Sequence, residues 1–138
     1  MLIFQREITI NTTGANFTDI THEVQKIVDQ SNIKTGCCII FIRHTSASLV
    51  IQENADRAVL RDLNHWLSDL APTERDWEHN DEGVDDMPAH ARAAITRTSE
   101  NIPIANGRLT LGTWQGLYLW EHRRRPHQRQ LVIHITGI

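Results

Sequence analysis

The sequence has little cysteine, few aromatic residues and no long apolar run. It contains two cysteines among 138 residues, Cys37 and Cys38, so it has neither a disulfide framework nor a zinc-ribbon spacing. Because neighbouring residues of a strand point to opposite faces, these two are poorly placed to bond each other, and we expect small buried side chains. No apolar run approaches the roughly 20 residues that cross a bilayer. These absences argue against a disulfide-rich secreted domain and against a membrane-spanning helix.

The composition otherwise predicts one ordinary globular domain over residues 1–138. Hydrophobic residues make up 40% and charged residues 22% of the chain, which is usual for such a domain. The net charge of -3 gives no overall attraction to nucleic acid or to acidic membranes. The first residues lack the basic start and apolar centre of a signal peptide. We therefore expect a cytoplasmic protein that binds neither nucleic acid nor membrane.

Hydrophobic periodicity predicts an α+β fold with about three helices. Helices are expected from about Thr18 to the turn at 32–36, from 54 or 56 to 70, and over 88–98. Strands are expected at 3–10, 37–42, 49–51, 102–104, 108–111, 117–122 and 130–136. The continuous apolar run 37–42 predicts a strand buried on both faces. The spacing of Trp66 predicts that it belongs to the apolar stripe by which the second helix packs against the core. Since regular βαβ alternation is missing, the sheet should be mostly antiparallel.

The segment from His79 to His90 combines two histidines with four carboxylates. Imidazole and carboxylate groups are the usual ligands of zinc, manganese or iron, and carboxylates alone suit magnesium. Asp86 and His90 are four residues apart at the predicted start of a helix, and Gly83 permits a turn that returns His79 toward them. Residues 74–86 hold seven acids and one arginine, a charge that solvent, a cation or an arginine must offset. The segment is either a metal site or a solvated acidic loop with Asp86 as a helix cap.

A second polar cluster follows the predicted buried strand at its end. His44, Ser46 and Ser48 lie within five residues, and Glu53 and Asn54 follow soon after. Hydroxyl and backbone N–H groups at such a place can hold phosphate oxygens. His44 could bind a metal or act as a general acid or base. The alternative is a turn whose hydroxyl groups satisfy the backbone.

A third cluster surrounds two glycines in the C-terminal third of the chain. Trp114, in a turn between them, could stack on a flat ring, and Arg108 or Arg123 could pair with phosphate. The alternative is a hairpin that places Trp114 and Trp120 in the core or a subunit interface, which we favour for Trp120.

Four arginines lie between Arg123 and Arg129. The cluster is short and lacks the interleaved aromatic residues of a nucleic-acid site. It could face the acidic segment, or it could form a solvated hairpin tip, which we expect for Arg124, Arg125 and Arg129.

Taken together, the three clusters resemble those of the YjbQ-like family, whose members are often labelled secondary thiamine-phosphate synthases. The matching blocks are His44-Thr45-Ser46-Ala47-Ser48 with Glu53-Asn54, His79-Asn80-Asp81-Glu82-Gly83 leading into Asp85-Asp86-Met87-Pro88-Ala89-His90, and Leu111-Gly112-Thr113-Trp114-Gln115-Gly116 with Glu121-His122-Arg123. The resemblance covers nearly the whole chain, and three blocks in the same order are specific.

The resemblance implies a compact domain with β-sandwich-like sheets that assembles as a homotrimer. It implies a metal held by His44, His79 and His90 with nearby carboxylates, for which we name Asp86. The implied activity joins a hydroxymethylpyrimidine diphosphate to a thiazole phosphate and releases pyrophosphate, an activity usually regarded as secondary.

We therefore expect an enzyme of small phosphorylated metabolites that uses zinc, magnesium or manganese. The catalytic candidates are His44, His122 and Glu53. The substrate-binding candidates are Ser46, Ser48, Asn54, Arg108, Trp114 and Arg123. Two alternatives remain open: a metal-dependent hydrolase of phosphate or other esters, and a non-catalytic module that binds a metal or metabolite.

Overall fold

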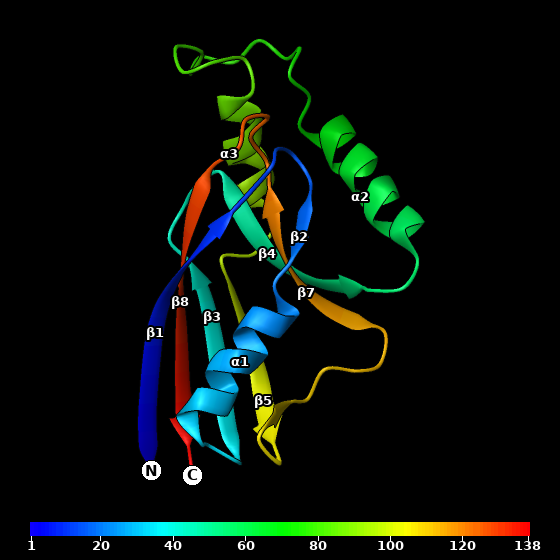
Figure 1. The fold of residues 1–138 in the computed structure, drawn as a ribbon. Coiled ribbons are helices and arrows are strands. Elements are labelled where there is room, and N and C mark those ends of the chain that lie inside the picture. Colours follow the sequence, from blue (N-terminus) through cyan, green and yellow to red (C-terminus); the bar gives the residue numbers. More distant parts are fainter.

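Eight strands form two antiparallel sheets in the computed structural model, which describes all residues 1–138 (Figure 1). The strands are β1 (Leu2–Asn11), β2 (Phe17–Asp19), β3 (Gly36–Ile42), β4 (Ala47–Glu53), β5 (Ser99–Ala105), β6 (Arg108–Leu109), β7 (Gln115–Glu121) and β8 (Gln128–Gly137). The helices are α1 (Thr21–Ser31), α2 (Arg57–Leu70) and α3 (Asp86–Ala94). The larger sheet has the order β1-β8-β3-β5-β6 and the smaller one β2-β7-β4. The predicted α+β class with mostly antiparallel, sandwich-like sheets is confirmed.

The core lies between the larger sheet, the smaller sheet and α1. On β3, Cys38, Ile40 and Ile42 are buried, whereas Ile39 and Phe41 are 39% and 45% exposed. The prediction that this strand is buried on both faces is therefore wrong, because α1 and the smaller sheet cover one face only. Both cysteines are free.

The helices lie close to the predicted places, but α3 ends at Ala94, before its predicted end at 98, and α1 begins later than expected. Thr18 does not cap α1, because it lies in β2, and Asp19 instead accepts the backbone N–H of Thr21 at 3.0 Å. The helix α2 begins at Arg57, next to the predicted start at 54 or 56, and the carboxylate of Asp56 caps it by accepting the N–H of Ala58. None of the three helices has the length and apolar character needed to cross a bilayer.

The second helix is covered less than its apolar stripe predicts. Leu67 is buried, but Trp66 and Leu70 are 56% and 55% exposed. The core role expected for Trp66 is therefore wrong. The physical reason is the position of α2 at the side of the molecule, where it packs beside β4 of the smaller sheet (Figure 1).

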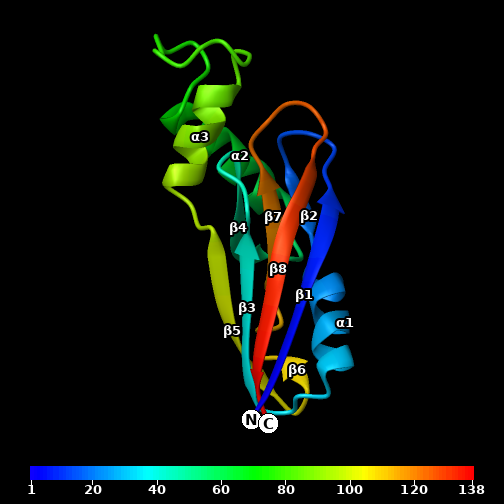
Figure 2. The same cartoon turned by 90° about the vertical axis from the view of Figure 1, so that its left-hand side faces the viewer.

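The two ends of the molecule carry different groups (Figure 2). The helix α3 and the loop that precedes it lie at one end, together with the turn between β7 and β8. The short strand β6 and both termini lie at the other end. The three polar clusters of the sequence are therefore not all in one place.

Candidate metal centre

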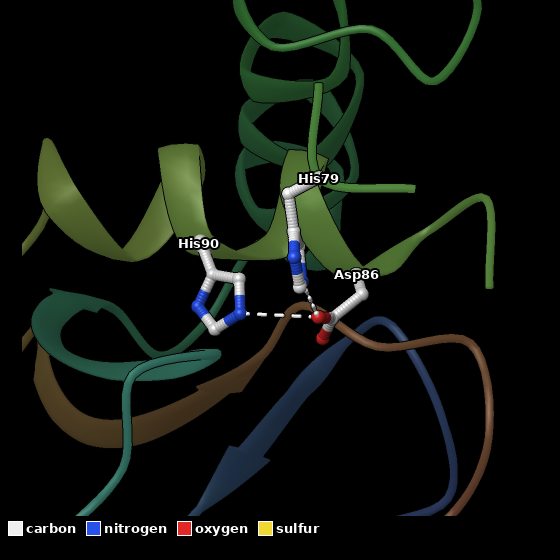
Figure 3. A group of neighbouring side chains, drawn as sticks. All are labelled: His79, Asp86 and His90. Atoms are coloured by element: carbon white, nitrogen blue, oxygen red, sulfur yellow. Dashed lines mark hydrogen bonds and ion pairs between the residues drawn. The ribbon is translucent and has the colours of Figure 1, made fainter. Parts of the chain in front are cut away.

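His79, Asp86 and His90 converge at the N-terminal end of α3 (Figure 3). Nε2 of His79 lies 2.6 Å and Nε2 of His90 lies 3.1 Å from the same carboxylate oxygen, Oδ2 of Asp86. One potential ligand atom from each residue lies within 4.8 Å of the others. The structure thus brings together the three residues that the spacing predicted as metal ligands.

The local backbone explains this convergence. Asp86 is the first residue of α3 and His90 lies one turn later, so both side chains occupy one face of the helix. Gly83 has a φ of +98°, a left-handed conformation that glycine adopts without strain. This turn folds the acidic segment back, so that His79 reaches Asp86 from the other side.

A carbonyl group fixes the tautomer of His90. Nδ1 of His90 lies 2.9 Å from the carbonyl oxygen of Thr45. Since a carbonyl only accepts, Nδ1 carries the hydrogen and donates it. In the neutral ring this leaves the lone pair of Nε2 on the side of Asp86, which is the form that binds a metal.

Arg123 binds the oxygen of Asp86 that does not face the histidines. Its Nη1 donates to Oδ1 of Asp86 at 2.8 Å and its Nε donates to Oδ2 of Asp85 at 3.0 Å. The backbone N–H of Arg124 also donates to Asp85. Oδ2 of Asp86 therefore remains for the two histidines. Arg123 faces the acidic segment, one of the two placements expected for the arginine cluster, rather than standing free to bind phosphate.

The electrostatic environment favours the protonated form of His79 and the ionised form of Asp86. The hydrogen bond to Asp86 raises the pKa of His79 above its ordinary value. Burial alone would raise the pKa of Asp86, but the hydrogen bonds from its neighbours, first from His79, outweigh burial and lower it. Without a metal, His79 thus holds a proton at Nε2 that it shares with Asp86.

An open cavity of about 640 Å³ adjoins His79. Its lining residues are Trp77, Glu78, His79, Asn80, Asp81 and Met87. The volume falls within the range of small-molecule sites. The side chains of His79 and His90 are 39% and 31% exposed, so the group is accessible from solvent.

His44, the further ligand implied by the family resemblance, does not join this group. Its Nε2 accepts the backbone N–H of Gln130 at 2.8 Å, and its Nδ1 lies 3.4 Å from Nη1 of Arg129. Both ring nitrogens thus face β8. Burial, followed by the charge of Arg129, lowers the pKa of His44.

Arg129 is buried, contrary to the expectation of a solvated hairpin tip. It is 4% exposed and its guanidinium pairs with the fully buried carboxylate of Glu121. The same guanidinium donates to Ser46, at 3.0 Å from its Oγ. The one signal in the sequence is an acid at the end of an apolar strand, eight residues before an arginine across a hairpin.

Ser48 and His122 form a separate buried pair. Oγ of Ser48 lies 2.9 Å from Nε2 of His122, and the two residues are 0% and 2% exposed. Burial, followed by the charge of Arg92, lowers the pKa of His122 to about 3. Trp120, on β7 two residues before His122, is 4% exposed, as expected.

The remaining candidates lie away from the metal group. Glu53 caps the backbone N–H of Ala55, and Asn54 donates to the carbonyls of Thr113 and Gln115. Trp114, 65% exposed, precedes β7, whereas Arg123 follows that strand. Seven strand residues separate the two by roughly 23 Å. Arg108 begins β6, at the opposite end of the molecule from α3 (Figure 2).

The donor set fits a divalent transition metal. Two imidazole groups and one carboxylate, held by a carbonyl and a guanidinium behind them, match the ligand types and supporting bonds of such centres. The local excess of carboxylates also favours a cation here.

Comparisons with known proteins give the same family across the chain. A family model described as "UPF0047 protein YjbQ-like" matches residues 6–138. A UPF0047 protein of Synechocystis sp. is 54% identical over 134 residues, which cover 96% of this chain and 91% of that protein. The UPF0047 protein YjbQ of Escherichia coli is 33% identical and covers 97% of this chain and 98% of its own length.

Solved structures agree. A crystal structure of an uncharacterized conserved protein of the YjbQ/UPF0047 family from Clostridium acetobutylicum has a TM-score of 0.87 and 36% identity, over 95% of this chain and 99% of that one. A YbjQ-like protein of unknown function from Sulfolobus solfataricus also has a TM-score of 0.87, with 28% identity over 99% and 100% of the two chains. The chain belongs to the YjbQ-like UPF0047 family.

Proposed function

We propose that this protein is a metal-dependent enzyme that acts on small phosphorylated metabolites. The observation that carries the proposal is the convergence of two imidazole Nε2 atoms on one oxygen of Asp86. Three protein ligands with an accessible side are typical of catalytic rather than structural metal sites. Zinc or manganese suits this mixed nitrogen and oxygen set, and magnesium is the third candidate.

The acidic surroundings support a bound cation as part of the proposal. The cavity beside His79 is lined by Glu78 and Asp81, which repel a phosphate group. A bound divalent ion would offset these charges and stabilise the negative charge of a departing phosphate or pyrophosphate. The chain supplies the orientation: Arg123 fixes Asp86, and the Thr45 carbonyl fixes His90.

Within this class we propose a thiamine-phosphate synthase-like transfer, as the family resemblance implies. The transfer joins a hydroxymethylpyrimidine diphosphate to a thiazole phosphate and releases pyrophosphate. Catalysis would rest on holding two reactants together and on electrostatic stabilisation. We also propose that the protein is a cytoplasmic homotrimer. Light scattering measures its oligomeric state.

A hydrolase is the second candidate, and one observation favours it. The side chain of His79 is 39% exposed and borders the open cavity of about 640 Å³. Water therefore has direct access to the group. A metal with three protein ligands commonly activates such a water.

A paired assay tests both candidates. Purified protein loaded with zinc, manganese or magnesium in turn is given both thiamine precursors, or a generic phosphate ester alone. Thiamine phosphate formation that requires both precursors and disappears in His90→Ala supports the transfer. Ester turnover without a second substrate supports the hydrolase. Metal binding with no turnover of any kind would reject both and leave a binding module.

A further inference from the structure

A second cavity, of about 230 Å³, lies between α2, α3 and the end of β7. Its polar lining includes Asn64 and Ser68 from α2, Arg92 from α3, and His122. None of the three proposed metal ligands lines it. The cavity is therefore distinct from the metal centre and from the open space beside His79.

His122 presents an unpartnered N–H to this cavity. Ser48 is completely buried, and its only hydrogen-bond partner is Nε2 of His122. The hydroxyl hydrogen of Ser48 must therefore be donated to Nε2, because a buried O–H without an acceptor is costly. The single hydrogen of the neutral ring then sits on Nδ1, which has no partner in the chain. His122 is 2% exposed and contributes to the cavity wall.

Arg92 adds a positive charge without a counter-ion. Its Nε and Nη2 both donate to the carbonyl oxygen of Ala71, at 3.2 Å and 2.9 Å. This pair of bonds fixes the plane of the guanidinium and leaves Nη1 free. Arg92 forms none of the ion pairs of the structure. A fixed, unpaired guanidinium in a cavity wall is suited to an anion.

The other lining groups agree with this polarity. The side-chain oxygen of Asn64 accepts the indole N–H of Trp120 at 2.7 Å, so its amide N–H groups remain available. Ser68 contributes a hydroxyl. Glu121 is the one acid of the wall, and Arg129 compensates its charge.

We propose that this cavity binds a small oxyanion, a phosphate or carboxylate group, through the Nδ1–H of His122 and the guanidinium of Arg92. The proposal does not depend on the metal centre. It assigns His122 to ligand binding and gives Ser48 the role of fixing the ring tautomer. A cavity of this size accommodates the anionic group of a ligand rather than a whole nucleotide.

Nuclear magnetic resonance of the His122 ring tests the proposal in the intact chain. The ring nitrogens are followed while the protein is titrated with inorganic phosphate and, separately, with acetate. We expect the protonated Nδ1 form before titration and a saturable shift of Nδ1 with at least one anion. The anion that produces the shift distinguishes a phosphate site from a carboxylate site.

Two variants and two controls complete the test. Arg92→Gln removes the charge, and Asn64→Asp adds a carboxylate of the same shape that still accepts the indole N–H. Each should weaken anion binding by about tenfold or more. The matched surface changes Arg43→Gln and Gln30→Glu should leave it within about twofold. A His122 ring that neither anion moves, or unchanged binding in folded Asn64→Asp, would overturn the proposal.

Discussion

Glu121 and Asp86 are both buried carboxylates held by an arginine, yet their remaining partners differ in kind. Glu121 accepts bonds from Arg129, from the hydroxyl of Thr12 and from backbone N–H groups. None of these donors loses its proton near neutral pH. Asp86 gives one oxygen to Arg123, and its other oxygen faces the imidazole Nε2 atoms of His79 and His90. The first arrangement is permanent, whereas the second can exchange the Nε2 proton of His79 for a cation.

The largest effect should follow from breaking the permanent pair. Glu121→Gln keeps the side-chain volume but leaves Arg129 buried without a counter-charge. Loss of one partner of a buried pair costs about 3–5 kcal/mol, so we expect the free energy of unfolding in denaturant to fall by that amount. The matched control is Glu7→Gln, which removes the exposed partner of Arg43 and should cost less than about 1 kcal/mol. Equal losses in the two variants would contradict the distinction.

A mutation in the group of His79, Asp86 and His90 should instead change metal affinity strongly and stability little. His90→Ala should lower zinc affinity by at least about 100-fold, since loss of supporting partners alone costs 10–100-fold. Because the ring is 31% exposed, the free energy of unfolding of the metal-free protein should change little. Calorimetric titration measures the affinity, with His134→Ala as the control histidine outside the group. A His90→Ala protein that binds zinc as the wild type does would remove the metal centre.

Acid should lower the free energy of unfolding through His122. Its pKa is about 3 in the folded chain, against an ordinary value of 6.5. Between these values the unfolded chain binds a proton that the folded chain does not, so the free energy of unfolding falls as pH decreases from 6.5 toward 3. The slope of this loss from His122 is at most about 1.4 kcal/mol per pH unit. His122→Gln, which still accepts the Ser48 hydroxyl, should flatten the curve; an unchanged slope would show that His122 is not the group responsible.

His79 gives the smallest effect, on metal affinity. Its pKa is raised in the folded chain, so the proton that zinc must displace from Nε2 is held more tightly than in a free histidine. Zinc affinity should therefore rise with pH, by about tenfold per unit from this proton, up to the raised pKa. His79→Asn should bind zinc more weakly and lose this part of the pH dependence. Competition titrations at pH values on both sides of 6.5 measure the zinc affinity of both proteins. The same pH dependence of zinc affinity in the wild type and in His79→Asn would exclude proton exchange at His79.

The sequence predicts the convergence of His79, Asp86 and His90 because the geometry that brings them together is local. Asp86 and His90 share a helix face through their spacing alone, and Gly83 permits the turn that returns His79. The segment was expected to be either a metal site or a solvated loop, and the convergence of these three side chains favours the first reading.

Long-range packing explains what the sequence does not predict. Arg129 looks like part of a solvated arginine run until the β7–β8 hairpin places it against Glu121. Trp66 has the spacing of a core residue, but only tertiary structure decides that α2 lies at the side of the molecule. Arg108 and Trp114 are both candidates for substrate binding, yet the strands place them away from α3. Spacing along the chain cannot report such distances.

The central claim is that His79, Asp86 and His90 bind one divalent metal. Crystals grown with zinc, measured at the zinc absorption edge, test it most directly. We expect one anomalous peak bonded to Nε2 of both histidines and to Oδ2 of Asp86, with Arg123 still on Oδ1. Fully ordered side chains with no peak between them, and the His79–Asp86 hydrogen bond retained, would contradict the claim.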